Sequence, residues 1–150
     1  MIGRMSFFLL FSCLAFQMLG CSKRENLLFI VPDGFQGAIR VVPNSLDGVD
    51  PQRENGALVF EIPASGVLKI KGPSPFKVMH TAVARFKSGK AIVYNTGVLR
   101  DQEDNDADIV YMTEFGMDER SNSWLYVCPS ISESRAAMGA DLEPGKRIVR

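Results

Sequence analysis

The fold of this chain is decided by the stretch Leu27-Leu-Phe-Ile-Val-Pro-Asp-Gly-Phe-Gln-Gly-Ala-Ile-Arg-Val-Val42. Its two apolar runs flank a turn sequence, which predicts two β-strands joined by a tight connection. Pro32 suits position i+1 of a turn over residues 31–34, and Gly34 can adopt the positive φ that such a turn requires. We expect Phe35 to fold back on the core and Gly37 to let two backbones approach closely.

Short apolar runs separated by turn residues continue along the rest of the chain. Several of them alternate apolar and polar side chains, as strands with one buried face do. Most links have the length of hairpin loops, such as Pro63–Gly66 and Lys87–Lys90, which favours antiparallel pairing. The predicted class is therefore all-β, an antiparallel β-sandwich or open barrel. The further expected strands are Leu58–Ile62, Val67–Lys71, Lys77–Phe86, Ala91–Tyr94, Ile109–Thr113 and Ser123–Cys128.

One short C-terminal helix is expected after these strands. Ser130 and Glu133 have the spacing of a capping box for a helix that begins at Ile131, and Gly139 is placed to end it. We expect residues 141–150 to form a flexible tail.

The first twenty residues differ in composition from the rest. Arg4 provides a positive charge, and Met5–Leu19 then runs about 15 residues without any charge. A membrane-spanning helix needs about 20 apolar residues, whereas the apolar region of a secretory signal peptide has roughly 7–15. Residues 1–20 are therefore expected to be a signal peptide, with an uncleaved signal anchor as the alternative.

The segment Met18-Leu-Gly-Cys21 resembles the lipobox of bacterial lipoproteins. In that family the signal peptide is cut before the cysteine, the thiol takes a diacylglycerol, and the new amino group is often acylated. Gly20 and Cys21 match the usual form, whereas Met18 and Leu19 replace the commonest residues. The resemblance implies a lipid attachment at Cys21, built from fatty acids such as palmitate.

The domain organisation follows from this resemblance. It comprises the lipoprotein signal peptide at 1–20, a tether at 21–26 and a β-sandwich domain at 27–140. Ser22 gives no inner-membrane retention signal, so we expect a membrane-anchored lipoprotein of the outer membrane that faces the periplasm or the cell exterior. The alternative is a disulfide between Cys21 and Cys128. With Cys21 lipidated, Cys128 is expected to be a buried thiol.

The motifs Phe29-Ile-Val-Pro-Asp-Gly-Phe-Gln-Gly-Ala-Ile-Arg-Val41 and Ile62-Pro-Ala-Ser-Gly-Val67 resemble those of a family of uncharacterised bacterial exported domains. The family pattern is Val/Ile-Pro-Asp/Glu-Gly-Phe/Tyr-x-Gly, followed further along the chain by Ile-Pro-x-Ser-Gly. The resemblance covers residues 27–128. It implies an exported β-sandwich domain and brings no catalytic residues.

The charge of the chain bears on its partners. It carries 17 basic and 17 acidic residues, so its formal net charge is +0. Neutralising nucleic-acid phosphates needs a clustered basic surface, so nucleic acid is not an expected partner. The expected partners are the membrane, through the lipid anchor, and an envelope protein or glycan.

His80 is the one histidine of the sequence. With no second histidine and one cysteine left after lipidation, a zinc site is very hard to build. A Ser-His-acid triad would have to use His80 itself. This residue lies within an expected strand, where we expect a satisfied core or edge histidine. We therefore expect no enzyme activity, no catalytic residues and no cofactor.

The acidic stretch Asp101–Asp108 is rich in carboxylates, the ligand type that calcium prefers. Three of its aspartates have the alternate spacing with which an EF-hand loop begins, although the later positions of that motif do not match. We expect a solvated loop between two strands, with a calcium site as the alternative. The candidate calcium ligands are Asp104, Asp106 and Asp108.

Aromatic side chains are frequent on the later strands. Trp124 and Tyr126 alternate with Leu125, and Tyr94 and Tyr111 lie on neighbouring runs. A carbohydrate or peptide platform would use such rings on an exposed face. We expect them to pack in the core, the more common use of aromatic residues in β-proteins.

The function expected from the sequence is that of a non-enzymatic, lipid-anchored envelope protein, a binding or structural module of unknown ligand. The alternative is a calcium-assisted adhesion or glycan-binding module. A carboxylate-based hydrolase is less favoured, because Asp101, Glu103 and Glu114 would have to converge in a cleft with separated pKa values.

Overall fold

The chain is mostly β-structure with one short helix, as the sequence predicts. The computed structural model describes residues 24–95, 108–138 and 140–148. Within these ranges the helices are α1 (Ile131–Ala137) and the short 3-10 helix η2 (Pro75–Lys77), and neither is long and apolar enough to cross a membrane. The strands of the described part are β1 (Glu25–Val31), β2 (Gly37–Val42), β3 (Gln52–Glu54), β4 (Ala57–Glu61), β5 (Val67–Lys69), β6 (His80–Phe86), β7 (Ala91–Asn95), β8 (Tyr111–Met117) and β9 (Ser123–Cys128).

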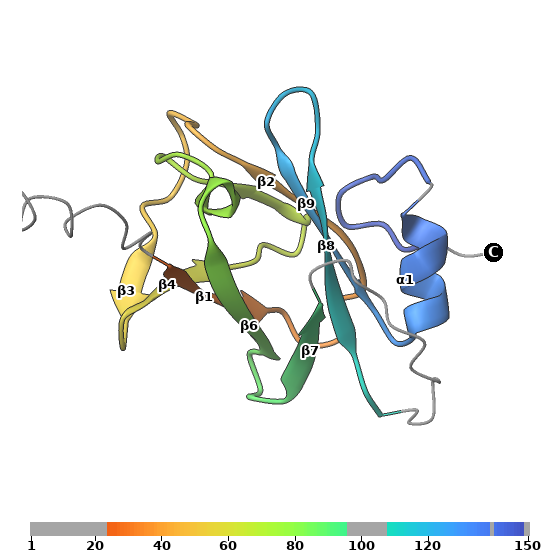
Figure 1. Ribbon diagram of the computed structural model, residues 1–150. Helices are drawn as coiled ribbons and strands as arrows, with labels where there is room; N and C mark the ends of the chain where they lie inside the picture. Colours follow the sequence, from red (N-terminus) through yellow and green to blue (C-terminus); the bar gives the residue numbers. More distant parts are fainter. Residues whose placement is uncertain (1–23, 96–107, 139, 149–150) are drawn as a thin grey trace, which may run out of the picture.

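These strands form one curled sheet that resembles half of a barrel (Figure 1). Their order is β3-β4-β1-β6-β7-β8-β9-β2-β5. Four of the eight neighbouring pairs are parallel, namely β1 with β4, β1 with β6, β2 with β5 and β7 with β8. The expectation of a purely antiparallel sheet is therefore wrong, and the sheet is mixed.

The error arises from two short links that are corners rather than hairpins. The link after β1 carries the chain to the opposite wall of the curled sheet, and the link Pro63–Gly66 does the same after β4 (Figure 1). β4 is consequently parallel to β1, and β5 is parallel to β2. Ile62 N donates to Ile30 O (2.8 Å), which joins the two corners. Link length does not distinguish a corner from a hairpin, because a few residues suffice for either.

The link Lys87–Lys90 is a hairpin, as predicted. β6 and β7 pair antiparallel, with Ala84 opposite Ile92. Phe86 N donates to Lys90 O (2.8 Å) across the base of the hairpin.

The turn of the first corner lies one residue later than the sequence predicts. Phe35 N donates to Pro32 O (3.1 Å), so Asp33 and Gly34 are its central residues. Gly34 has the expected positive φ, 74°, and Phe35 packs against the core as expected. Asp33 Oδ1 accepts from Ser88 N (3.0 Å), which ties this corner to the β6–β7 hairpin.

The concave face of the sheet encloses the main core. The ring of Phe29 stacks on those of Phe60 and Tyr94, with centroid separations of 5.5 and 6.0 Å. Removing apolar surface from water contributes about 25 cal/mol per Å², so these large side chains dominate the stabilisation. Fully buried members of this core include Leu27, Phe29, Ile39, Phe60, Leu68, Ile70, Met112 and Leu125.

Helix α1 and residues 140–148, the C-terminal segment, cover the outer face of β2, β8 and β9 (Figure 1). Gly145 N donates to Ala38 O (2.8 Å), and Ala38 N donates to Lys146 O (3.0 Å). Leu142 and Ile148 pack into the apolar cluster beneath α1. The described part of the C-terminus is thus packed on the sheet, where the sequence predicts a loose tail.

Helix α1 begins with the predicted cap. Ser130 Oγ accepts from Glu133 N (3.2 Å). The Glu133 carboxylate accepts from Tyr126 OH (3.0 Å) and Arg147 Nε (2.7 Å), so it fixes the C-terminal segment as well as the helix. Gly139, the expected end of the helix, lies outside the described residues.

Two glycines of the sequence motifs make room for the C-terminal segment. A Cβ on Gly37 would lie 2.6 Å from the carbonyl carbon of Lys146. A Cβ on Gly66 would lie 2.6 Å from Ala38 O and closer still to the backbone of Gly145. The close approach expected at Gly37 is therefore confirmed, and its partner is the C-terminal segment.

Candidate functional site

A partly buried polar cluster lies on the concave side of the sheet and joins β6, β7 and β8. His80 Nε2 lies 3.0 Å from Glu114 Oε2, and Tyr94 OH donates to the same oxygen at 2.8 Å. The side chains of His80 and Glu114 are 11% and 15% exposed. The ring of Phe76 meets that of His80 edge-on, with centroids 5.4 Å apart. Aromatic packing therefore shields the His80–Glu114 contact from one side.

Each ring nitrogen of His80 has a hydrogen-bond partner. Nδ1 lies 2.9 Å from Val78 O, and Nε2 faces the Glu114 carboxylate. A neutral imidazole has one N–H, so only the doubly protonated ring donates to both acceptors at once. Burial and the adjacent Glu114 carboxylate raise the pKa of Tyr94, which keeps its hydroxyl a donor. Both ring nitrogens of His80 and the hydroxyl of Tyr94 thus face acceptors within this region.

The sequence did not predict this cluster, because its members are far apart along the chain. His80 and Glu114 are 34 residues apart, and no local pattern links them. The one available sign was a single histidine at an inward-facing strand position. His80 is a satisfied histidine, as expected. Asp101 and Glu103, the other members of the carboxylate hypothesis, lie outside the described residues, so their convergence with Glu114 stays untested.

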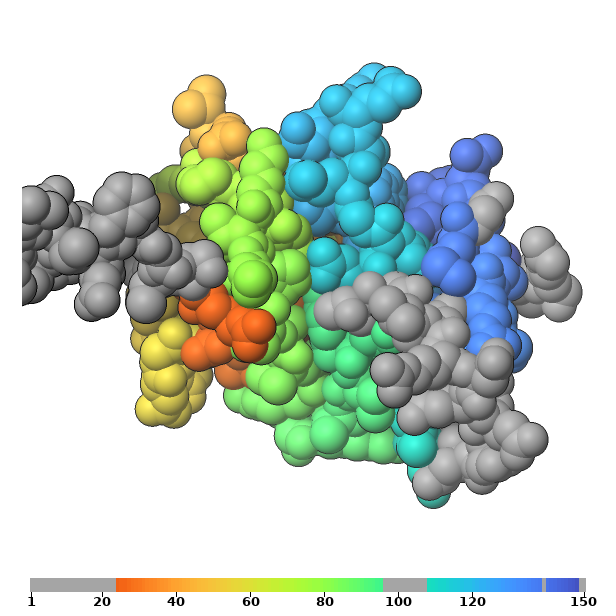
Figure 2. Space-filling view, viewed as in Figure 1, coloured from red at the N-terminus to blue at the C-terminus, as the bar shows by residue number. Residues whose placement is uncertain are grey.

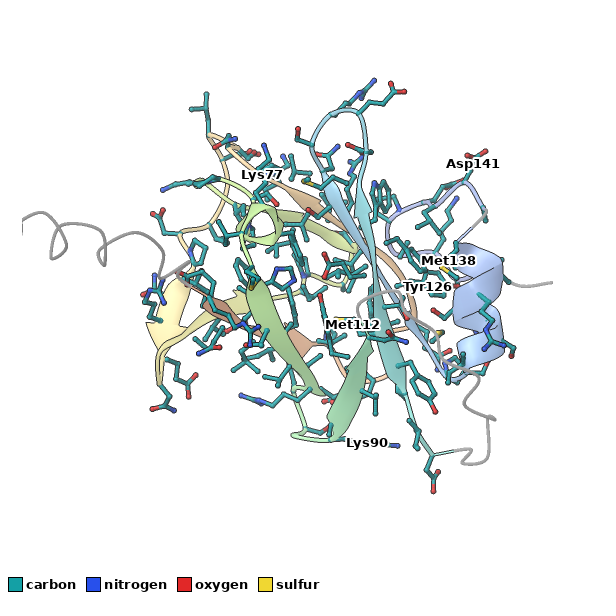
Figure 3. All side chains as sticks on the ribbon, viewed as in Figure 1. Lys77, Lys90, Met112, Tyr126, Met138 and Asp141 are labelled. Atoms are coloured by element: carbon teal, nitrogen blue, oxygen red, sulfur yellow. The ribbon has the colours of Figure 1, made fainter. Side chains whose placement is uncertain are left out.

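A groove of about 370 Å³ lies between the β8–β9 hairpin and the segment that follows α1. The rings of Phe115 and Trp124 line it together with Met117 and Met138. These two methionines are 48% and 50% exposed, although their side chains are apolar. Met138 and Asp141 mark the α1 side of the groove (Figure 3). The groove therefore combines accessible apolar surface with a carboxylate.

Asp118 fixes the hairpin side of this groove. Its carboxylate accepts from the backbone N–H groups of Arg120 and Asn122, both at 2.9 Å, and from Trp124 Nε1 at 3.1 Å. Desolvation opposes the ionisation of Asp118, but hydrogen bonds from Asn122, Trp124 and Arg120 outweigh it and lower the pKa. The carboxylate consequently stays charged and orients the indole ring.

The aromatic residues of the later strands have two different roles. Tyr126 and Tyr111 are 0% and 8% exposed, and Tyr94 packs against the main core, as expected. Trp124 is half-buried and lines the groove instead. Arg40 lies over the indole ring, with its Cζ 5.9 Å from the ring centroid. Since Trp124 is the chain's one tryptophan, its fluorescence reports on the groove.

Cys128 is a buried thiol, as expected. Its side chain is fully buried beside α1, and Sγ donates to Ser130 O at 3.1 Å. Burial raises the pKa of Cys128 to about 12, which makes the reactive thiolate rare at neutral pH. Cys21 lies outside the described residues, so the alternative Cys21–Cys128 bridge stays untested.

Most of the other candidate residues also fall outside the described ranges. They include the lipid-attachment residue Cys21 and the calcium candidates Asp104 and Asp106. Asp108 is described and is exposed. Within residues 24–95, 108–138 and 140–148, no three His, Cys, Asp or Glu side chains gather closely enough to hold a metal ion. The calcium site therefore stays a hypothesis.

Comparison with known proteins gives one structural similarity. No family model matches the chain, and no curated protein matches it. A crystal structure from Bacillus anthracis, described as "Putative Lipoprotein", is similar with a TM-score of 0.48 and 16% sequence identity. The similarity covers 83% of this chain and 85% of that chain.

Proposed function

We propose that this chain is a non-enzymatic, lipid-anchored protein of the bacterial envelope whose folded domain is a binding module. The observation that carries the proposal is the position of Cys21. It follows Gly20 at the end of an apolar stretch and stands four residues before β1 begins at Glu25. Two acyl chains on one cysteine provide stable anchoring, whereas one chain binds only marginally. Ser22 favours the outer membrane, facing the periplasm or the exterior.

The groove is the proposed binding surface. Its methionines are flexible and polarisable, so they adapt to apolar partners of different shape. The charged Asp118 and Asp141 carboxylates favour a partner that also carries a positive charge. We infer that the ligand is a segment of an envelope protein with apolar side chains and a basic residue, and a glycan is the alternative.

The polar cluster supports a structural rather than a catalytic role. Glu114 is engaged by both His80 and Tyr94, and His80 is engaged at both ring nitrogens. General acid–base catalysis needs a group that reaches a proton on the substrate. In this cluster these groups face one another.

Metabolic labelling with palmitate tests the anchor. We expect the wild-type protein to incorporate label and to sediment with membranes. The Cys21→Ser variant should lose the label and leave the membrane fraction, whereas the control Cys128→Ser should retain both properties. An unlabelled wild-type protein, or a Cys21→Ser variant that still sediments with membranes, would contradict the proposal.

Titration followed by Trp124 fluorescence tests the groove. Peptides with apolar side chains and one lysine should shift the emission. Met138→Lys should weaken their binding several-fold, because it removes apolar surface and repels the lysine. Leu46→Ala is the matched control, because Leu46 is 99% exposed and does not line the groove. A response to oligosaccharides but to none of the peptides would favour the glycan alternative.

A further inference from the structure

The outer face of the sheet carries an exposed apolar row on the half formed by β4, β1, β6 and β7. Val59 is opposite Leu28, and Leu28 is opposite Val83. The register of β6 and β7 places Val93 next in this row, opposite Val83. Val83 and Val93 are 61% and 48% exposed, and the other two are half-buried. Single exposed apolar residues are ordinary, whereas a contiguous set across four strands marks an interaction surface.

This row lies on the strands that receive the tether. β1 is the first strand of the domain, and it lies between β4 and β6. Arg24, which precedes β1, contacts Met79, which precedes β6, with Nη2 3.8 Å from Sδ. Met79 is 58% exposed. Exposed apolar side chains therefore occur both at the end of the domain where the tether joins β1 and further along the same strands.

The proposed anchor keeps this half of the domain close to lipid. Arg24 is three residues after Cys21, a reach of at most about 10 Å. Leu28 lies four residues further on, about 13 Å along an extended strand. The tether is thus short enough to bring the outer face of β1 and its neighbours against the bilayer.

The charged residues around the apolar row favour contact with anionic lipid headgroups. Arg24 and Lys77 are exposed at the end where the chain enters, and Arg85 follows Val83 on the same face of β6. Glu54 and Glu61 are also on the outward side, and Lys87 Nζ lies 3.9 Å from the Glu61 carboxylate. The basic residues still outnumber these two acids. Basic groups attract anionic headgroups while apolar side chains enter the interface between them.

We propose that the outer face of β4, β1, β6 and β7 rests on the lipid surface that holds the anchor, with Leu28, Val83 and Val93 in contact with the bilayer. This inference rests on the proposed lipid anchor. In Figure 2, β1 and β6 (orange-red and green) lie on one side of the molecule and the C-terminal segment (blue) on the other. The groove beside α1 would therefore stay accessible to a partner.

Site-directed fluorescence on the acylated full-length protein tests this orientation. The protein is purified from membranes, its acylation is verified by intact mass, and it is reconstituted into vesicles of phosphatidylcholine and phosphatidylglycerol. A fluorophore is attached in Val83→Cys or in Met138→Cys. Met138 is the matched control, because it is apolar, similarly exposed and located beside α1, away from β1 (Figure 3). Cys128 is buried and does not compete for the label.

Nitroxide-bearing lipids should quench the label at position 83 several-fold more strongly than the label at position 138. Val93→Cys provides a second reporter should Val83→Cys alter the Trp124 emission of the folded protein. Equal quenching at positions 83 and 138, or no quenching at 83 or 93, would overturn the proposed orientation of an acylated chain. A label at position 83 that is shielded from water but not quenched by the lipids, on a protein that is dimeric, would assign this face to contact with a second copy of the chain. An unacylated chain would overturn the anchor itself, and the mass measurement identifies that case.

Discussion

One row of outward-facing residues crosses most of the sheet, and its two halves have opposite environments. Val93 is registered with Tyr111, and Tyr111 with Cys128, so the row that contains Val83 continues onto β8 and β9. Val83 and Val93 are 61% and 48% exposed, whereas Tyr111 and Cys128 are 8% and 0% exposed. The difference arises because α1 and residues 140–148 cover the second half.

This comparison separates residues that stabilise the fold from residues available for association. A sheet with apolar residues on both faces needs a layer on each. The curl of the sheet covers the inner face, and the chain's own C-terminal segment covers the outer face of β2, β8 and β9. The outer face of β4, β1, β6 and β7 leaves its apolar residues half-buried or exposed. The covered half is therefore expected to respond to mutation through stability and the exposed half through membrane contact.

The largest effect is expected where the covering segment meets the sheet. Gly66→Ala should lower the free energy of unfolding by about 3 kcal/mol or more, because the new Cβ meets the backbone of Gly145 and Ala38 at a positive φ of 70°. Gly34→Ala is the matched control, since its φ is 74° but no atom lies within 4 Å of the new Cβ. It should cost only about 1–2 kcal/mol. Urea unfolding followed by Trp124 fluorescence measures both, and equal losses would contradict the close approach.

A smaller effect is expected from the hydroxyl that holds the end of the covering segment. Tyr126 OH accepts from Ile148 N (2.7 Å) and donates to Glu133 (3.0 Å). Tyr126→Phe should cost about 1–2 kcal/mol and speed amide hydrogen exchange at Ile148. Tyr94→Phe, which removes a buried hydroxyl from the other half, should leave the exchange at Ile148 unchanged. Undiminished protection of Ile148 in Tyr126→Phe would show that this hydroxyl does not hold the segment.

The features that the sequence predicted depend on local patterns. The strands follow from short alternating runs, the Lys87–Lys90 hairpin from its turn residues, and the α1 cap from Ser130. The close approach at Gly37 was also predicted, because a glycine beside a strand permits it. Each of these depends on residues that are neighbours along the chain.

The features that the sequence missed depend on contacts between distant segments. Whether the link Pro63–Gly66 is a hairpin or a corner is decided by the pairing of β4 with β1, not by the link itself. The packing of residues 141–148 depends on room left by Gly37 and Gly66, far upstream. The cluster of His80 and Glu114 likewise forms only once β6 and β8 are placed in the curled sheet.

Raising the pH should lower the free energy of unfolding, because a thiol and a phenol are buried in the covered half. Burial raises the pKa of Cys128 from 9.0 to about 12 and that of Tyr126 from 10.0 to about 12. The unfolded chain loses these protons first, so their contribution to stability is complete below pH 9 and is lost as the pH rises towards 12. We expect a loss of about 1–2 kcal/mol by pH 10 in urea unfolding. Cys128→Ala should show a shallower dependence, and an identical slope would contradict the contribution of the thiol.

The smallest effect is expected in the exposed half of the row. Val83→Thr should change the free energy of unfolding by no more than about 0.5 kcal/mol, because the side chain is 61% exposed and threonine keeps the β-branched shape. The same substitution at Val127, which is fully buried, should cost about 1–3 kcal/mol because the hydroxyl loses its hydration. Equal losses in urea unfolding would mean that Val83 is packed against something in the free protein. If Val83→Thr leaves the free energy of unfolding unchanged, folding does not require an apolar side chain at position 83. Contact with a surface outside the domain then remains as the role of this side chain.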